Sequence, residues 1–234
     1  MATAKSESKW PVGNADWKGL VVMGDIGLLG GGFDPVHIGH IAVAETVNKE
    51  LALSKVLFIP AAVPPHKEIS ASFQDRLNML RLAISGKKGF EITTMEAERQ
   101  GPSYTVDSLH TLQQEFSEDV ELFFITGFDA FSEIKLWKSY NELLRLASFV
   151  VIDRPGYCQQ SLEEFCAREF FDVFPAGEDV WQVKGGKRIY RLKMDPVFVS
   201  STEIRERLKN RLPINSMVPE EVEDYIYRHG LYIS

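Results

Sequence analysis

Strand-length apolar runs alternate with segments of helical period along this 234-residue chain, and this alternation limits the fold more than any other feature. The apolar runs that have the length of strands cover residues 26–31, 55–62, 90–95, 120–126 and 148–153. The segments of helical period between them cover residues 40–51, 73–84, 104–116 and 137–147. This order is typical of parallel strands joined by helical crossovers, and nearly continuous apolar strands indicate a sheet covered on both faces. The sequence predicts an α/β fold with a doubly wound parallel sheet.

The alternation loosens after residue 155. We expect a helix and then two strands around the Gly185–Gly186 turn within residues 156–195, as an insertion or a hairpin and not as a second domain. A strand at 196–200 and helices at 201–210 and 219–230 would then form a small C-terminal helical part. The expected organisation is one domain over residues 26–234. It follows an extension, residues 1–25, whose composition indicates loose order.

The first predicted strand runs into the stretch GGGFDPVHIGH, residues 30–40. In an open parallel sheet, ligands bind beyond the carboxyl ends of the strands, and the first strand-to-helix turn is the usual phosphate site. Glycines at 30–32 let a ligand approach the backbone, and a helix from about Ile38 would add unpaired N–H groups and a positive dipole end. The stretch contains neither GxGxxG nor a P-loop motif. We expect a phosphate-binding turn of another kind, with a plain tight turn as the alternative.

Two histidines follow these glycines. His37 and His40 are three residues apart, so they share one face at the start of a helix. A metal pair is one interpretation, but no acidic or cysteine partner follows at zinc spacing, and Cys158 and Cys166 form no CxxC motif. We therefore expect no metal ligands in the protein and interpret the histidines as donors to phosphate oxygens. A structural or exposed role for either one is the alternative.

The charge and the apolar content of the sequence limit the classes of binding partner. Lys and Arg number 26 against 33 Asp and Glu, which gives a formal charge of −7, whereas broad nucleic-acid binding needs a basic surface. An anionic small molecule remains compatible, provided that positive groups and N–H donors cluster locally. No apolar run approaches the ~20 residues that span a bilayer, and residues 1–19 lack the apolar core of a secretory signal. We expect a cytoplasmic protein that binds neither nucleic acid nor a membrane.

GGGFDPVHIGH resembles the signature of the nucleotidyltransferases that contain a HIGH motif, and its form GGxFDPxHxGH is similar to that of the bacterial nicotinate mononucleotide adenylyltransferases. Between residues 26 and 233, five further blocks resemble that family in the same order: IPAAVPPHK (59–67), PSYTVDSL (102–109), FFITGFDAFSEIKLW (123–137), VSSTEIR (199–205) and VPEEVEDYIYRHGLY (218–232). The resemblance implies the Rossmann-like nucleotidyltransferase fold.

The resemblance also implies an activity. Such an enzyme transfers AMP from ATP to the phosphate of nicotinate mononucleotide and releases nicotinate adenine dinucleotide and pyrophosphate, with Mg²⁺ accompanying ATP, as a step of NAD biosynthesis. The attacking phosphate oxygen is already ionised at neutral pH, so no general base is needed. Orientation of the two substrates, worth on the order of 7–11 kcal/mol, and fixed donors would carry the rate. ATP and nicotinate mononucleotide are thus the expected partners, and a homo-oligomer is left open.

By the same resemblance, the glycine turn binds ATP. His37 and His40 would face the ATP phosphates, with His40 nearest to the transferred α-phosphate. Gly31 and Phe33 lie where backbone N–H groups of the family meet the nucleotide. Gly32 departs from the family pattern, which has Thr or Ser there, so its backbone N–H is the remaining donor. For Asp34, which precedes a proline, we favour a structural role that caps the turn or the next helix.

Two cations and a second helix start complete the expected ATP site. Lys67 follows two prolines that stiffen its loop, and we expect it to contact phosphate. Ser200 begins an S-x-x-E capping box, so a purely structural interpretation of this block is a capped helix. The resemblance adds Ser201 and Thr202 at the β- and γ-phosphates, with Arg205 as their charge clamp. Lys67 and Arg205 join the two histidines as the predicted catalytic set.

The resemblance places nicotinate mononucleotide under the blocks at 102–109 and 123–137. Thr105 would bind the nicotinate end, Gly127 would line the pocket, Asp129 would meet the ribose, and Trp137 would stack on the pyridine ring. Trp137 as plain core is the alternative. Phe128 departs from the family, which favours a small residue there, and this affects the expected shape of the pocket.

The predicted pocket favours the acid over the amide of the pyridine nucleotide. Thr105 and the backbone N–H groups near Trp137 and Lys138 are donors, and SYT at 103–105 contains no carboxylate that could accept an amide N–H. A mismatched hydrogen bond in a buried site costs ~1–3 kcal/mol.

Two kinds of alternative remain. One is a sister transferase that acts on nicotinamide mononucleotide, pantetheine phosphate or a cytidylyl acceptor. The other is a nucleotide sensor without turnover. The joint presence of His37, His40, Lys67 and Arg205 argues against the sensor, which need not keep every phosphate-contacting group.

Overall fold

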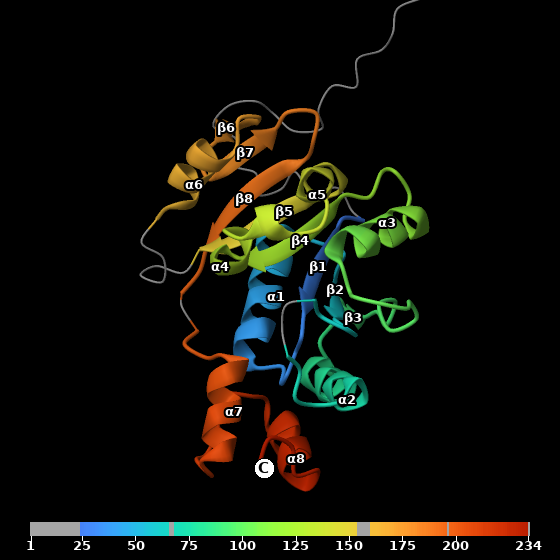
Figure 1. Ribbon diagram of the computed structural model, residues 1–234, viewed down its shortest axis with the longest axis vertical. Coiled ribbons are helices and arrows are strands. Elements are labelled where there is room, and N and C mark those ends of the chain that lie inside the picture. The colour runs from blue at the N-terminus through green and yellow to red at the C-terminus, as the bar shows by residue number, and fades with distance from the viewer. Residues whose placement is uncertain (1–23, 66–67, 154–159, 196, 234) are drawn as a thin grey trace, which may run out of the picture.

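The computed structural model describes residues 24–65, 68–153, 160–195 and 197–233. Within these residues, a sheet of eight strands has the order β3-β2-β1-β4-β5-β8-β7-β6 (Figure 1). The strands are β1 (Ile26–Gly31), β2 (Lys55–Pro60), β3 (Phe90–Ile92), β4 (Leu122–Gly127), β5 (Ser148–Asp153), β6 (Val173–Gly177), β7 (Val180–Val183) and β8 (Arg188–Lys193). The helices are α1 (Ile38–Glu50), α2 (Phe73–Ile84), α3 (Thr105–Glu115), α4 (Phe128–Phe131), the short 3₁₀ helix η1 (Ile134–Leu136), α5 (Tyr140–Leu146), α6 (Leu162–Glu169), α7 (Ser201–Lys209) and α8 (Glu220–Arg228).

Six neighbouring strands are parallel, in the order β3, β2, β1, β4, β5 and β8. This confirms the predicted doubly wound sheet. Strand β1 pairs with β2 on one edge and with β4 on the other. The chain therefore builds outward from β1 to β2 and β3, and then returns to the other side for β4 and β5. The strand order reverses between β1 and β4, where a ligand crevice forms in sheets of this kind.

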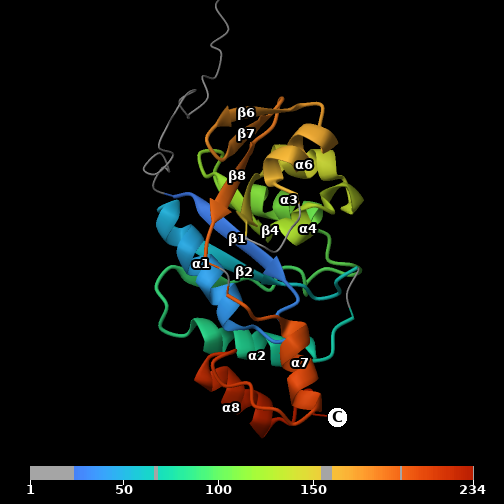
Figure 2. The ribbon, with the colours of Figure 1, turned by 90° about the vertical axis from the view of Figure 1, so that its left-hand side faces the viewer.

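Two apolar cores lie on the two faces of the sheet. Successive strand residues face opposite sides, so Val56 and Phe58 of β2 join one core while Leu57 and Ile59 join the other. The first core contains apolar residues of α1, α2, α7 and α8, and the second contains those of α3, α4, α5 and α6. Figures 1 and 2 show α7 and α8 together at one end of the molecule, next to α2. They form the predicted C-terminal helical part.

Residues 160–195 depart from the expectation. The hairpin at Gly185–Gly186 is confirmed, since this turn joins β7 to β8. The sheet gains three strands here instead of two, and β8 pairs in parallel with β5 while β7 and β6 extend the edge in antiparallel fashion. The segment is therefore part of the main sheet.

The predicted strand at 196–200 is wrong for the described residues 197–200, which form no strand. The backbone N–H of Val199 donates to the carbonyl of Val197 at 2.9 Å, a local turn that an extended strand does not contain. The apolar stretch at 188–193 takes the place beside β5, with Ile189 and Tyr190 buried.

Most of the predicted N-terminal extension, residues 1–23, lies outside the described residues. The extension and the single domain after it therefore stay predictions. None of the described helices combines the length and the apolar character that crossing a membrane requires.

Candidate functional site

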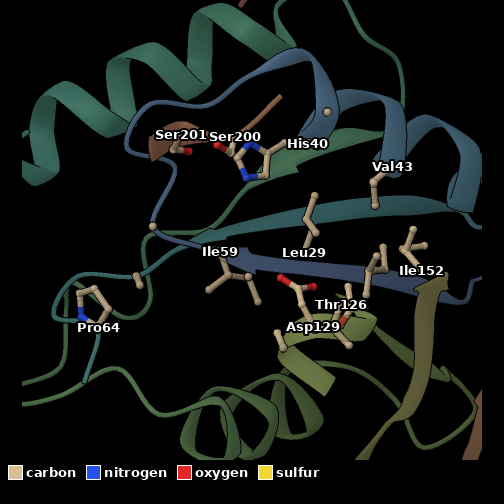
Figure 3. A pocket seen from close by; sticks show the side chains of 18 of the residues that line it. Leu29, His40, Val43, Ile59, Pro64, Thr126, Asp129, Ile152, Ser200 and Ser201 are labelled. Atoms are coloured by element: carbon tan, nitrogen blue, oxygen red, sulfur yellow. Dashed lines mark hydrogen bonds between the residues drawn. The ribbon is translucent and has the colours of Figure 1, made fainter. Parts of the chain in front are cut away.

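A cavity of about 670 Å³ opens beyond the carboxyl ends of the central strands (Figure 3). Its strand-borne lining comes from residues 29–31 of β1, Ile59 of β2, residues 124–127 of β4 and Ile152 of β5. It thus lies beyond the carboxyl ends of the strands, as predicted, at the switch point between β1 and β4. The volume falls within the ~300–1,000 Å³ that is typical of small-molecule sites.

The N-termini of three helices line this cavity. Helix α1 contributes His37, Gly39 and His40, α3 contributes Thr105 and Ser108, and α7 contributes residues 200–203. The first N–H groups of a helix have no acceptor within it, and the helix dipole makes this end positive. Three such ends at one cavity supply the local positive cluster that a chain with a net charge of −7 needs in order to bind an anion.

The two histidines occupy the shared face that their spacing predicted. His37 is the N-cap residue of α1, and its ring stacks on that of His40 with centroids 3.7 Å apart. The backbone N–H of His37 donates to Nδ1 of His40 at 3.2 Å. Because Nδ1 accepts, the neutral His40 ring carries its proton on Nε2. His40 therefore presents an N–H donor on the side of its ring opposite to this bond.

Glycines allow the close packing around the histidines. A Cβ at Gly39 would lie 3.0 Å from Nδ1 of His37 and 3.2 Å from the Val199 side chain, so glycine is what lets α1 approach the segment before α7. A Cβ at Gly32 would lie 3.0 Å from Cδ1 of Ile69. The side chain of Ile69 thus occupies the space into which the usual Thr or Ser would extend at this departure from the family.

Asp34 has the structural role that we expected, but with different partners. Its carboxylate accepts hydrogen bonds from the backbone N–H groups of Ser70 (2.7 Å) and Ala71 (3.0 Å) and from the hydroxyl of Tyr232 (2.7 Å). The helix-cap version of the prediction is wrong, since His37 is the N-cap of α1. Burial, followed by the hydrogen bond to Asp34 and the charge of Asp34, raises the pKa of Tyr232 above its usual range.

The buried Arg76 of α2 holds the glycine turn by hydrogen bonds to its backbone. Its Nη1 donates to the carbonyl oxygens of Gly32 at 2.6 Å and Ala61 at 2.8 Å, so one guanidinium joins the turn after β1 to the turn after β2. The side chain is 1% exposed, and this burial lowers its pKa while the charge of Asp34 opposes the shift. Arg76 was not among the predicted site residues. Its available signal was a charged residue beside the buried Leu77 and Leu80 of an amphipathic helix.

Some of the residues that were predicted to bind ATP line the cavity, and others do not. Gly31, Gly32, Ser201 and Thr202 line the cavity with the two histidines, and the Ser201 hydroxyl donates to the carbonyl of Pro35 at 2.9 Å. Phe33 does not line it: its buried ring meets the edge of His40, with centroids 5.0 Å apart.

The two predicted cations are not part of the described lining. Nη1 of Arg205 donates to the backbone carbonyl of Asp34 at 2.7 Å and lies 3.9 Å from its carboxylate. Lys67 lies outside the described residues. The described part of the chain contains no group of three or more His, Cys, Asp and Glu that could hold a metal ion.

All four predicted acceptor residues, Thr105, Gly127, Asp129 and Trp137, line the cavity. Half-buried Trp137 packs edge-on against Phe124, with centroids 5.9 Å apart. The prediction that the backbone N–H of Trp137 is a donor to the nicotinate carboxylate is wrong. This N–H already donates to the carbonyl of Ile134 at 2.9 Å and closes η1.

Phe128, the second departure from the family, does not shape the cavity. Its side chain is buried in the second core and packs against Phe165 of α6, with centroids 5.8 Å apart. The α3 side of the cavity contains further residues that were not predicted, namely Pro64, Glu96, Ser103 and Ser108. The two serines could have been predicted, because they stand in the PSYTVDSL block of the family resemblance. Glu96 stands in none of the blocks.

Comparison with known proteins places this geometry in a family. The cytidylyltransferase-like family model matches residues 28–207. A protein of Desulfatibacillum aliphaticivorans with the name "Probable nicotinate-nucleotide adenylyltransferase" is 42% identical over 218 residues, which cover 89% of this chain and 99% of that one. A Thermus thermophilus protein of the same name is 41% identical over 207 residues, with 88% and 98% of the two chains covered.

Among solved structures, the fold is similar to "Plasmodium falciparum nicotinic acid mononucleotide adenylyltransferase complexed with NaAD", with a TM-score of 0.72 at 19% identity over 89% of this chain and 97% of that one. At this identity the likeness bears on the fold alone. The extent of the family match and the identity to full-length relatives decide the assignment. The chain belongs to the cytidylyltransferase-like family and, within it, to the nicotinate-nucleotide adenylyltransferases.

Proposed function

We propose that the protein transfers the adenylyl group of ATP to the phosphate of nicotinate mononucleotide, releasing nicotinate adenine dinucleotide and pyrophosphate in NAD biosynthesis. Family membership supports the reaction. The observation that carries it in this chain is the convergence of three helix N-termini on one cavity at the switch point of the sheet.

The cavity has the form that two nucleotide substrates need, because it extends over both faces of the sheet. Its apolar lining on the α1 face includes Val43, Ile125 and Ile152, and its lining on the α3 face includes Leu109 and Phe124. We call these the α1-side arm and the α3-side arm. ATP would fill the α1-side arm with its adenosine, and nicotinate mononucleotide would fill the α3-side arm, so that their phosphates meet near His40.

The chain's own groups would act by positioning and by stabilising charge. The Nε2–H of His40 donates to the transferred phosphate, and the N-termini of α1 and α7 face the phosphates on either side of it. Charge develops on the departing pyrophosphate, and preformed donors stabilise such charge without reorganisation. Lys67 and Arg205 remain the predicted cationic contacts.

Mg²⁺ would accompany ATP and neutralise phosphate charge when it is bound. Magnesium sites at nucleotides commonly take most of their ligands from phosphates and water. The lack of a metal-binding cluster among the described residues fits an ion that is held in this way.

Helix α3 supports the acid as acceptor. It begins at Thr105 without a side-chain cap, and the N–H of Asp107 already donates to the carbonyl of Tyr104 at 3.1 Å. The backbone N–H and the hydroxyl of Thr105 are therefore the donors of this first turn at the cavity wall. These donors suit a carboxylate, whereas a carboxamide would set its own N–H groups against them.

The experiment measures pyrophosphate release with ATP and Mg²⁺ and one acceptor at a time: nicotinate mononucleotide, nicotinamide mononucleotide or pantetheine phosphate. We expect kcat/KM to be higher for the nicotinate substrate than for its amide by roughly tenfold to a hundredfold, from ~1–3 kcal/mol of mismatched hydrogen bonding. Preference for another acceptor would reassign the substrate. Binding of ATP without pyrophosphate release from any acceptor would instead identify a nucleotide sensor.

A further inference from the structure

Glu96 is the one buried carboxylate in the described lining of the cavity. Its side chain is 7% exposed, whereas Asp129 and Glu203 are exposed. It lies in the α3-side arm with Thr105 and Ser108. A carboxylate in this wall would repel an anionic ring substituent and would accept a hydrogen bond from an amide N–H. Taken alone, Glu96 therefore disfavours the acid substrate.

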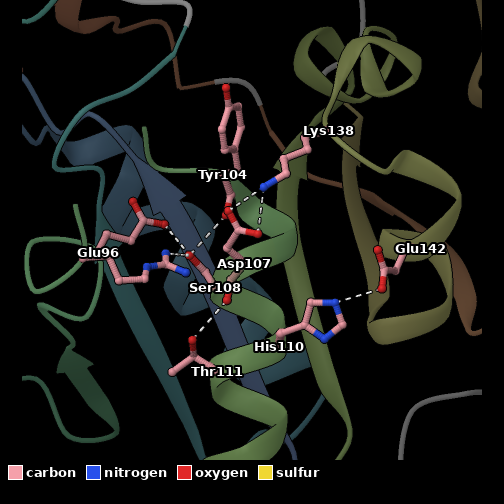
Figure 4. A network of polar contacts seen from close by, with 9 residues as sticks. Glu96, Tyr104, Asp107, Ser108, His110, Thr111, Lys138 and Glu142 are labelled. Carbon is pink, nitrogen blue, oxygen red and sulfur yellow. Dashed lines mark hydrogen bonds and ion pairs between the residues drawn. The ribbon is translucent and has the colours of Figure 1, made fainter. Parts of the chain in front are cut away.

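A chain of two hydrogen bonds restrains this carboxylate (Figure 4). The Ser108 hydroxyl donates to Oε1 of Glu96 at 2.6 Å, and Nη2 of Arg99 donates to the same hydroxyl oxygen at 2.7 Å. A guanidinium can only donate and an ionised carboxylate can only accept, so both directions are fixed; the carbonyl of Tyr104, at 3.5 Å from the same hydroxyl, is the more distant acceptor. Both lengths are in the range of charge-assisted bonds. Arg99 thus places a positive charge behind Ser108, and Ser108 anchors the oxygen of Glu96 on α3.

We propose that Ser108 and Arg99 are specificity-determining residues that turn the Glu96 carboxylate onto α3 and thereby make the α3-side arm select a carboxylate over a carboxamide on the pyridine ring. The inference rests on the proposed function. With these two hydrogen bonds in place, the cavity wall offers the donors of the α3 N-terminus to the ring substituent. Without the Ser108 hydroxyl, Glu96 becomes a free acceptor and an uncompensated charge in the same wall.

The test compares the ratio of kcat/KM for nicotinate mononucleotide to kcat/KM for nicotinamide mononucleotide among variants. Ser108→Ala should lower this ratio at least tenfold. Ser108→Thr keeps the hydroxyl and should retain most of the ratio. In Ser108→Ala combined with Glu96→Ala, the freed carboxylate is gone, so the acid preference should return. Thr111→Val is the matched control, because the Thr111 hydroxyl lies one turn further along α3 and donates to the carbonyl of Asp107 at 3.1 Å.

A purely structural role predicts a different outcome. If Ser108→Ala lowered both kcat/KM values by the same factor, or if the double variant kept the lowered ratio, the proposal would be refuted. Arg99→Met, which changes a partly exposed side chain, tests the same ratio should Ser108→Ala fail to fold. Calorimetric titration with the two acceptors measures the ratio without turnover. A protein that released no pyrophosphate but showed the predicted change in binding ratio would therefore refute the proposed function and support this inference.

Discussion

Replacement of Tyr232 by Phe removes one hydroxyl that contacts Asp34, directly after the glycine turn. That hydroxyl donates to Oδ1 of Asp34 at 2.7 Å, and both residues are buried. A hydrogen bond to a charged group contributes ~1.5–3 kcal/mol. The backbone N–H of Ala71 still donates to the same oxygen at 3.0 Å, so no buried acceptor is stranded. We expect the free energy of unfolding to fall by ~1.5–3 kcal/mol, which for a chain of this size lowers Tm by about 3–12 °C.

Chemical and thermal unfolding of the wild type and Tyr232→Phe provide the assay. Tyr227→Phe is the control, because Tyr227 is 47% exposed on α8, and it should change the free energy of unfolding by less than ~0.5 kcal/mol. The pH dependence adds a second check. The pKa of Tyr232 is raised in the folded protein, so above pH ~10 the native state binds more protons than the unfolded state and loses stability. The Phe variant lacks this term, so the difference between the two proteins should narrow above pH ~10. Equal stabilities at pH 7, or a difference that widens with pH, would refute the reasoning.

Three further outcomes follow, two from the site and one from the core. His40→Ala should lower kcat far more than it changes affinity for nicotinate mononucleotide, because the lost donor acts on charge that peaks in the transition state; an unchanged kcat in steady-state kinetics would remove His40 from the chemistry. Arg205→Ala should weaken ATP binding and slow turnover if the guanidinium clamps phosphates, whereas normal ATP kinetics would leave it a structural role through its contacts with Asp34 and Thr202. Burial raises the pKa of Cys166 to about 12, so at pH 8 only about one thiol in ten thousand is ionised, and alkylation of this residue, followed by peptide mass spectrometry, should be slow until the protein unfolds; rapid labelling of the native protein would contradict its burial.

The sequence predicted the features that depend on local pattern. The alternation of apolar runs with helical periods identified β1 to β5 and the crossover helices, because each strand or helix carries its own period. The three-residue spacing of His37 and His40 predicted their common face for the same reason. The strand predicted at 196–200 is wrong for the described residues 197–200. The second strand of the predicted hairpin, at 188–193, completes the parallel sheet instead, and only its pairing with the distant β5 decides this.

The supports of the site depend on contacts between distant residues. Tyr232 and Asp34 are 198 positions apart, and Arg76 is 44 positions from Gly32. No periodicity or spacing relates such pairs in a single sequence, so the buried groups that hold the glycine turn could not be predicted. Glu96 was missed for the same reason. It stands outside the recognised blocks, and its hydrogen bond with Ser108 of α3 joins residues 12 positions apart that no short motif relates.

The fate of the α-phosphate tests the central claim most directly. Purified protein is incubated with ATP labelled at the α-phosphorus, Mg²⁺ and nicotinate mononucleotide, and the label is followed chromatographically while pyrophosphate is measured. We expect the label to enter nicotinate adenine dinucleotide, with one pyrophosphate released per dinucleotide formed. Label that stays in ATP, or that appears in AMP or ADP without a dinucleotide, would contradict adenylyl transfer in this cavity.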